Sequence, residues 1–229
     1  MSDIMVDEES KPASEAQPKS APAIKKDEWA IVLDFLQHGR TIMDRSQPVA
    51  QVVGEDYFSL LEVIVRDDAA MKLEERVYIG DGKRDKVKYI RGRIEPKELT
   101  AAAKDELPEI IDKVVKLKPQ RFVDFFNKSG PLTTRMHSME LLPGIGKKHL
   151  WAIIDARKEK PFESFEDMKK RVPLLPDPEK LIVRRVLAEL EGSDKYSIFV
   201  LKPEPERHGH GGYGHPHTHG HSGFGGGRF

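Results

Sequence analysis

The 229-residue sequence predicts an α+β protein, in which a small antiparallel β-barrel precedes an all-helical domain. Three observations predict this arrangement. Five short apolar runs with glycine punctuation lie within residues 27–97, a pattern typical of a small barrel. Amphipathic segments with helical spacing fill residues 98–192. The two ends, residues 1–26 and 202–229, are polar or low in complexity, and we expect both to be disordered.

Composition limits the function classes. Hydrophobic residues make up 38% of the chain and charged residues 33%, which allows a modest core. The 38 basic and 38 acidic residues cancel, so any contact with nucleic acid must use local patches. The absence of cysteine excludes disulfides and thiolate metal sites. No apolar run reaches the roughly 18 residues that span a membrane, and the N-terminal residues lack the apolar core that a signal peptide would have. We therefore expect a cytoplasmic protein with no membrane partner.

The barrel candidates come first along the chain. The expected strands cover residues 29–36, 49–53, 57–66, 77–79 and 86–94. Asp81-Gly82 is a hairpin-turn signal between the last two. OB-type and S1-type barrels have this size and often bind nucleic acid, although that step is an analogy between folds.

The last hairpin of the barrel is strongly basic. Asp85 is the one acid among its basic residues, and Tyr78 and Tyr89 lie beside them. Basic side chains follow phosphates, and exposed aromatic rings stack on unpaired bases. A solvated edge hairpin, with the tyrosines in the barrel core, explains the pattern equally well. The candidate nucleic-acid contacts in this basic hairpin are Lys83, Arg84, Lys86, Lys88, Arg91 and Arg93.

The helical half begins with an amphipathic helix that we expect to start near Pro108. A second helix is expected at residues 119–128. Later helices are expected after Ser164 and Asp177, since both residue types cap helix N-termini. Residues 193–201 include a possible late strand, Ser197 to Leu201, that returns to the barrel.

The strongest functional signal lies in residues 141–154. A polar run at residues 133–142 predicts a helix that Pro143 ends. Gly144 and Gly146 flank Ile145, and an amphipathic helix opens at once. Free amides at that helix N-terminus, with the positive end of the helix dipole, form an anion site. A phosphodiester is the natural ligand, since such contacts need no particular base. The candidate residues, which we name the Gly–Lys turn, are Gly144, Ile145, Gly146, Lys147 and Lys148.

The pattern apolar-Pro-Gly-apolar-Gly-Lys-Lys between two helices resembles the hairpin of helix-hairpin-helix proteins, which bind DNA or RNA through the sugar-phosphate backbone. A plain glycine turn between packed helices is the alternative. Leu174-Leu-Pro176 repeats the start of the motif but lacks the glycines, so we expect a structural partner hairpin there. Arg184 and Arg185 follow it, and we expect them on a solvated helix face.

The C-terminal tail is rich in histidine. Neutral imidazole binds nickel, copper or zinc, but no acidic or thiolate ligand fixes a geometry here. We therefore expect opportunistic metal binding in vitro and no structural metal or cofactor. The tail histidines are His208, His210, His215, His217, His219 and His221.

Residues 28–196 resemble an uncharacterised archaeal family of the DUF655 type, which joins an OB-like barrel to a helix-hairpin-helix. The matching stretches include EWAIVLDFLQHG, KVKYIRGRIEPKELT and PFESFEDMKKRV. The resemblance implies an archaeal source, a cytoplasmic protein and nucleic-acid binding, and it implies no reaction.

We expect a non-enzymatic protein that binds nucleic acid, with a slight preference for RNA because such barrels read unpaired strands. Ribosomal or repair proteins are further candidate partners. A protein adaptor is the main alternative, favoured by the zero net charge. A DNA-repair glycosylase is less consistent, since Asp167 lacks the Val-Asp-x-His context of that class. The neighbouring acids Glu163 and Glu166 fit a solvated helix start better than a metal cluster.

Overall fold

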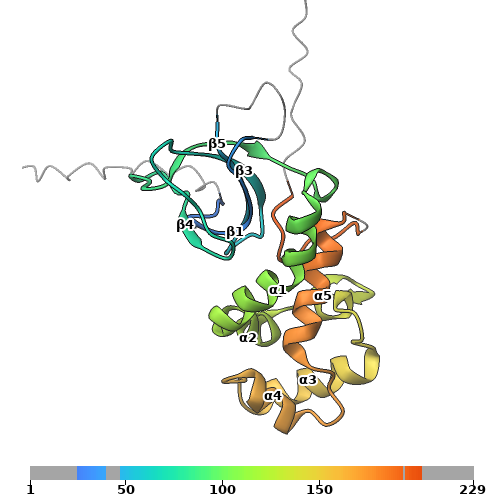
Figure 1. Cartoon of the computed structure of the whole chain (residues 1–229). Coiled ribbons are helices and arrows are strands. Elements are labelled where there is room, and N and C mark those ends of the chain that lie inside the picture. Colours follow the sequence, from blue (N-terminus) through green and yellow to red (C-terminus); the bar gives the residue numbers. More distant parts are fainter. Residues whose placement is uncertain (1–24, 40–46, 193, 203–229) are drawn as a thin grey trace, which may run out of the picture.

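The computed structural model describes residues 25–39, 47–192 and 194–202. Most of the predicted leader and the tail histidines lie outside the described residues. Figure 1 shows a curled sheet at one end of the molecule and the helices at the other, so the chain is α+β.

All five predicted strands are present and form one antiparallel sheet in the order β4-β1-β2-β3-β5. The sheet curls into a half-barrel (Figure 1). The third strand starts later than its apolar pattern predicts, because Phe58 has a positive φ of 51° and breaks the extended run. The strands are β1 Trp29–Leu36, β2 Val49–Gly54, β3 Leu60–Val65, β4 Arg76–Tyr78 and β5 Val87–Arg93.

Strand β1 is apolar on both faces because it separates two hydrophobic cores. Ala30 and Val32 face the core of the half-barrel. Ile31 and Leu33 face the second core, to which the helices contribute. A strand buried on both sides carries a continuous apolar run, as this sequence does. The sheet and the helices therefore share a core at β1.

Five α-helices follow the sheet. The first helix starts at Ala101, and the prediction that it starts near Pro108 is wrong. The Thr100 side chain accepts a hydrogen bond from the Ala103 amide at 3.1 Å, and this cap defines the start. Pro108 lies inside the helix on its exposed side. The helices are α1 Ala101–Leu117, α2 Pro119–Lys128, α3 Lys147–Glu159, α4 Phe165–Arg171 and α5 Pro178–Leu190.

Residues 133–142 do not form the predicted helix. They contribute to a short hairpin, β6 Pro131–Thr133 and β7 Met136–His137, and then to a 3-10 turn, η3 Ser138–Leu141. The Thr133 hydroxyl accepts hydrogen bonds from the amides of Arg135 and Met136 at 3.3 and 3.1 Å. Short polar side chains compete with helical hydrogen bonds in this way, and periodicity does not reveal it.

Residues 197–201 do not form a strand either. The amides of Ile198, Phe199 and Val200 donate to the buried Glu189 carboxylate at 2.7 to 2.9 Å, so they are unavailable to a sheet. The segment still returns to the half-barrel, where the Leu201 amide donates to the Tyr57 carbonyl at 3.2 Å.

Arg185 corrects the expectation of a solvated helix face, since its side chain is only 2% exposed. It donates to Glu189 at 2.7 Å and to the Leu141 carbonyl at 3.1 Å, and it also contacts Asp194. Arg184 is exposed, as expected. Helix α5 therefore ties the segment before the Gly–Lys turn to the C-terminal segment.

No helix among the described residues is both long and apolar enough to cross a membrane.

Candidate nucleic-acid interface

The Gly–Lys turn is fixed by a buried isoleucine. Ile145 is 6% exposed and belongs to the helical core. Its amide donates to the Leu142 carbonyl at 3.0 Å, which closes the turn. Gly144 has φ +101°, a conformation that L residues rarely adopt. A Cβ at Gly144 would lie 3.8 Å from Pro176, so the predicted partner hairpin packs beside this turn.

Gly146 is the N-cap of α3 and is extended, with φ −94° and ψ 177°. No side chain caps this helix, and a Cβ at Gly146 would meet nothing within 4 Å. The amides of the first helical turn are therefore open toward the space beside Gly146. Because that end also carries the positive end of the helix dipole, it favours an anion.

The two lysines of the turn differ in their surroundings. Lys147 lies 2.7 Å from Glu140 and is 64% exposed. Glu140 also accepts a hydrogen bond from the His137 amide at 2.8 Å. That amide first, and then Lys147, hold the pKa of Glu140 below its usual value. In the part of the chain that the structure describes, Lys148 has no ion-pair partner.

Three members of the basic hairpin form ion pairs with acids on neighbouring segments. These pairs are Lys86 with Glu75 at 2.5 Å, Arg91 with Glu62 at 2.8 Å, and Lys88 with Asp67 at 3.7 Å. Each acid offsets one positive charge, so the hairpin is less cationic in the fold than in the sequence.

Two further arginines of the hairpin donate to backbone carbonyls. Arg84 donates to Gly80 at 2.8 Å, and Arg93 donates to Leu201 at 2.7 Å. Of the six predicted basic contacts, Lys83 alone has no such partner among the described residues.

The tyrosines of the hairpin have separate roles. Tyr89 is 42% exposed and donates to Gln47 at 3.3 Å. Tyr78 packs edge-on against Trp29 with ring centroids 5.2 Å apart, and its hydroxyl accepts from the Gly82 amide at 3.2 Å. Tyr89 is therefore open to a ligand, whereas Tyr78 supports the fold.

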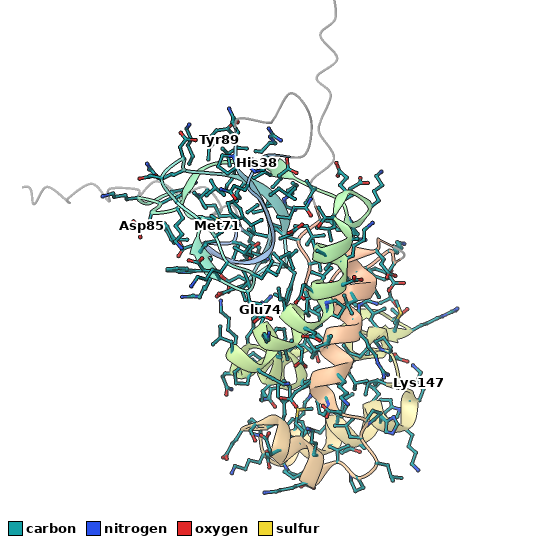
Figure 2. All side chains as sticks on the ribbon, viewed as in Figure 1. His38, Met71, Glu74, Asp85, Tyr89 and Lys147 are labelled. Carbon is teal, nitrogen blue, oxygen red and sulfur yellow. The ribbon has the colours of Figure 1, made fainter. Side chains whose placement is uncertain are left out.

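The two candidate surfaces lie on different parts of the molecule. Figure 2 places Tyr89 at the outer end of the half-barrel and Lys147 on the far side of the helical half. The structure does not bring the basic hairpin and the Gly–Lys turn into one site.

Sequence reasoning missed Trp151, which lies in α3 one turn beyond the Gly–Lys turn. Its side chain is 58% exposed, whereas Leu150 and Ile153 beside it are buried. The spacing of those two residues places Trp151 off the apolar face, and this signal was available in the sequence.

The acids around α4 support the start of that helix. The Ser164 hydroxyl accepts from the Asp167 amide at 3.1 Å, and Asp167 pairs with Arg171 at 3.1 Å. Glu163 pairs with Lys160 at 2.7 Å. The carboxylates thus have local partners.

One acidic cluster within the described residues has the spacing of metal ligands. Carboxylate oxygens of Glu74, Glu106 and Glu109 lie within 4.8 Å of one another. Glu74 also pairs with Lys113, which already offsets part of the charge. Surface acids with a lysine partner do not define a metal centre.

Comparisons with known proteins give a consistent result. The family model described as a protein of unknown function (DUF655) matches residues 26–201. The uncharacterized protein MJ0038 of Methanocaldococcus jannaschii is 42% identical over 185 residues, covering 80% of this chain and 84% of that protein. The crystal structure of Af1531 from Archaeoglobus fulgidus, of the same family, is similar with a TM-score of 0.69 at 48% identity. That match covers 76% of this chain and 100% of Af1531.

Proposed function

This chain belongs to the DUF655 family, and we propose that it is a non-enzymatic protein that binds nucleic acid by holding a backbone phosphate at the Gly–Lys turn. One observation carries the proposal. The N-terminus of α3 has no side-chain cap, and the space beside Gly146 is open. Among the preferred N-cap residues, Gly alone has no side chain to accept from the first amides, so an open start that is followed by two lysines favours an external anion.

The proposal includes a fold assignment for each half. The 3-10 turn, the glycine turn and α3 would form a short helix-hairpin-helix, with the α4–α5 connection as its partner. The half-barrel would be an OB-like or S1-like barrel. In support, β1 pairs with β2 and β4 while β3 pairs with β5, which gives five strands in a partly open barrel.

The electrostatics support a phosphate rather than a free carboxylate. A phosphate offers several acceptor oxygens, enough for the amides beside Gly146 and for Lys148 together. Lys147 shares its charge with Glu140, so Lys148 would provide most of the attraction. Such a site reads the backbone and gives no sequence preference.

The half-barrel would add a second, weaker surface. If the half-barrel is OB-like, as we propose, the connection between β4 and β5, which carries Lys83 and Arg84, would correspond to a loop that binds oligonucleotides in OB folds. Tyr89 is exposed on the edge strand β5. Because OB-like folds bind unpaired strands, RNA is slightly favoured over DNA.

A protein adaptor is the second candidate function, and two observations favour it. Three of the six basic residues of the hairpin form ion pairs with acids of the same chain. Leu174 is 81% exposed at the α4–α5 connection, which is unusual for a large apolar side chain. An exposed apolar residue of this kind fits a protein partner better than a phosphate.

A catalytic role has less support. The carboxylates of Glu163 and Asp167 near α4 form ion pairs with Lys160 and Arg171. A nuclease or glycosylase needs carboxylates free to bind a metal ion or attack a substrate.

The test compares full-length protein with a Lys147→Glu/Lys148→Glu variant on single-stranded RNA, single-stranded DNA and duplex DNA across a salt series, with a chelator present. We expect salt-sensitive binding by the wild type, with a slope of log K against log salt of about −0.7 to −0.9 per phosphate contact, and we expect the double substitution to abolish this binding. The matched control, Lys158→Glu/Lys160→Glu, makes the same charge change at the other end of α3 and should retain binding. An equal loss of nucleic-acid binding in both double variants would contradict the assignment of the binding site to the Gly–Lys turn.

A further inference from the structure

The two tryptophans of the chain lie in opposite environments. Trp29 is half-buried, with the Arg76 guanidinium 3.9 Å above its ring and Tyr78 against its edge. Trp151 is 58% exposed, and no ring or cation contact to it is found within the described residues. An exposed tryptophan offers a large, flat apolar surface with a polar N–H, and tryptophan is enriched at binding interfaces.

Trp151 lies close to the Gly–Lys turn. It follows Lys147 by four residues and Lys148 by three, so all three share one face of α3. Helical side chains tilt toward the helix N-terminus, which brings the indole toward the turn. Trp151 therefore lies about one helical turn, roughly 5.4 Å along the helix axis, from the residues that supply the open amides.

Charge is arranged asymmetrically around Trp151. On its N-terminal side lie Lys148 and the open amides of α3. On its C-terminal side Asp155 pairs with Lys158 at 3.1 Å and is neutralised. A ligand that places an anion toward the turn and a flat ring over the indole therefore fits this face.

We propose that Trp151 stacks on an unpaired base of the nucleotide whose phosphate the Gly–Lys turn holds, so that this site takes single-stranded nucleic acid. The inference rests on the proposed function and narrows its substrate class. In a duplex the faces of the bases are covered by their neighbours, and a side chain beside the backbone cannot reach them. An unpaired base offers its face, and stacking on an aromatic ring tolerates any base.

The experiment uses full-length protein, a labelled oligouridylate and a blunt duplex of equal length. Trp151→Ala should weaken single-strand binding by roughly 5- to 150-fold, the effect of losing one stacked base. Duplex binding should be unchanged. Trp151→Phe should keep most of the affinity because it retains a stacking ring. Leu117→Ala is the matched control, since Leu117 is also 58% exposed on a helix and is far from the turn in sequence.

Each outcome decides one of the two claims. If Trp151→Ala leaves single-strand binding intact while Lys147→Glu/Lys148→Glu abolishes it, the stacking inference is wrong and the phosphate site stands. An equal loss on single strand and duplex would also overturn the substrate class. If the wild type binds neither probe at low salt, the proposed function itself fails. Circular dichroism and thermal unfolding of each variant verify that the fold is retained.

Discussion

The two glycines of the Gly–Lys turn have different roles. Gly144 has φ +101°, which a side chain disfavours. Gly146 has an ordinary extended backbone and open space beside it, so the fold does not require glycine there. In the sequence the two residues are indistinguishable. Only the backbone angles show that Gly144 serves the turn, whereas Gly146 is free to serve a ligand.

Substitution at Gly144 should therefore destabilise the protein. Gly144→Ala forces a side chain into the left-handed region and places its Cβ 3.4 Å from Leu181. We expect a loss of about 1–2 kcal/mol in the free energy of unfolding. Urea denaturation measures it, with Gly146→Ser, which keeps a preferred N-cap for α3, as the control that should stay near wild type. An unchanged midpoint for Gly144→Ala would contradict the role assigned to its backbone.

Glu140 should compete with a bound phosphate for the charge of Lys147. Glu140→Gln keeps an oxygen that accepts from the His137 amide and removes the charge that pairs with Lys147. We expect several-fold tighter nucleic-acid binding at low salt, and a smaller gain at high salt because of screening. A fluorescence anisotropy titration at two salt concentrations measures this gain. Weaker binding would show that the ion pair positions Lys147 productively.

At the scale of elements, the apolar periodicity of the sequence predicts those helices and strands that packing on the core stabilises. Four of the five strands and the starts of helices α2 to α5 lie near their expected positions, because their apolar spacing and helix-start signals agree. Residues 133–142 have no such spacing, and hydrogen bonds of Thr133 decide the outcome. Pro108 misled the prediction, because the Thr100 cap starts α1 upstream and the helix continues through the proline.

The proline inside α1 has a measurable cost. Pro108 has no amide to donate to the carbonyl four residues earlier, and it lies on the exposed side of the helix. Pro108→Ala should raise the free energy of unfolding by about 2 kcal/mol. The substitution removes the penalty of a proline in a helix interior, and part of this gain is offset because alanine makes the unfolded chain more flexible. Thermal and urea unfolding test this expectation. A destabilised variant would mean that a bend at Pro108 is needed for α1 to pack on β1.

At the scale of the whole molecule, buried charges join the two halves. The Glu55 carboxylate at the sheet is fully buried and accepts from Arg76 at 2.5 and 3.1 Å. Lys118, at the junction of α1 and α2, lies 3.1 Å from it. Arg185 likewise connects α5 to the C-terminal segment. No local pattern in the sequence marks Glu55 as buried, since Arg76 and Lys118 are distant from it along the chain.

The Glu55 network predicts a dependence of stability on pH. Burial alone would raise the pKa of Glu55, but hydrogen bonds from Arg76 and Lys118 outweigh it and hold the pKa below the ordinary value of 4.5. A carboxyl with a depressed pKa stabilises the fold above its unfolded value, and this contribution is lost as pH falls through the folded value. The contribution should therefore be complete at pH 7 and decline below about pH 4.5.

Glu55→Gln isolates this contribution. We expect the variant to be less stable than wild type at pH 7 by about 1.5–3 kcal/mol, since it removes a charged hydrogen-bond partner. The difference should shrink as the pH falls below 4.5. Urea denaturation over a pH series gives both values. A difference independent of pH would contradict the assignment.

The proposed binding of a phosphate at the open start of α3 is best tested with the variant Gly146→Asp. Aspartate is a preferred N-cap and its charge favours the helix dipole, so the variant should fold with equal or slightly greater stability. The same carboxylate would occupy the amides and repel a phosphate. We expect Gly146→Asp to fold and to lose salt-sensitive binding to single-stranded RNA. Gly146→Ser, which introduces a neutral cap, should retain more of this binding. If the folded Gly146→Asp variant binds single-stranded RNA as tightly as the wild type, α3 does not hold a phosphate at its N-terminus.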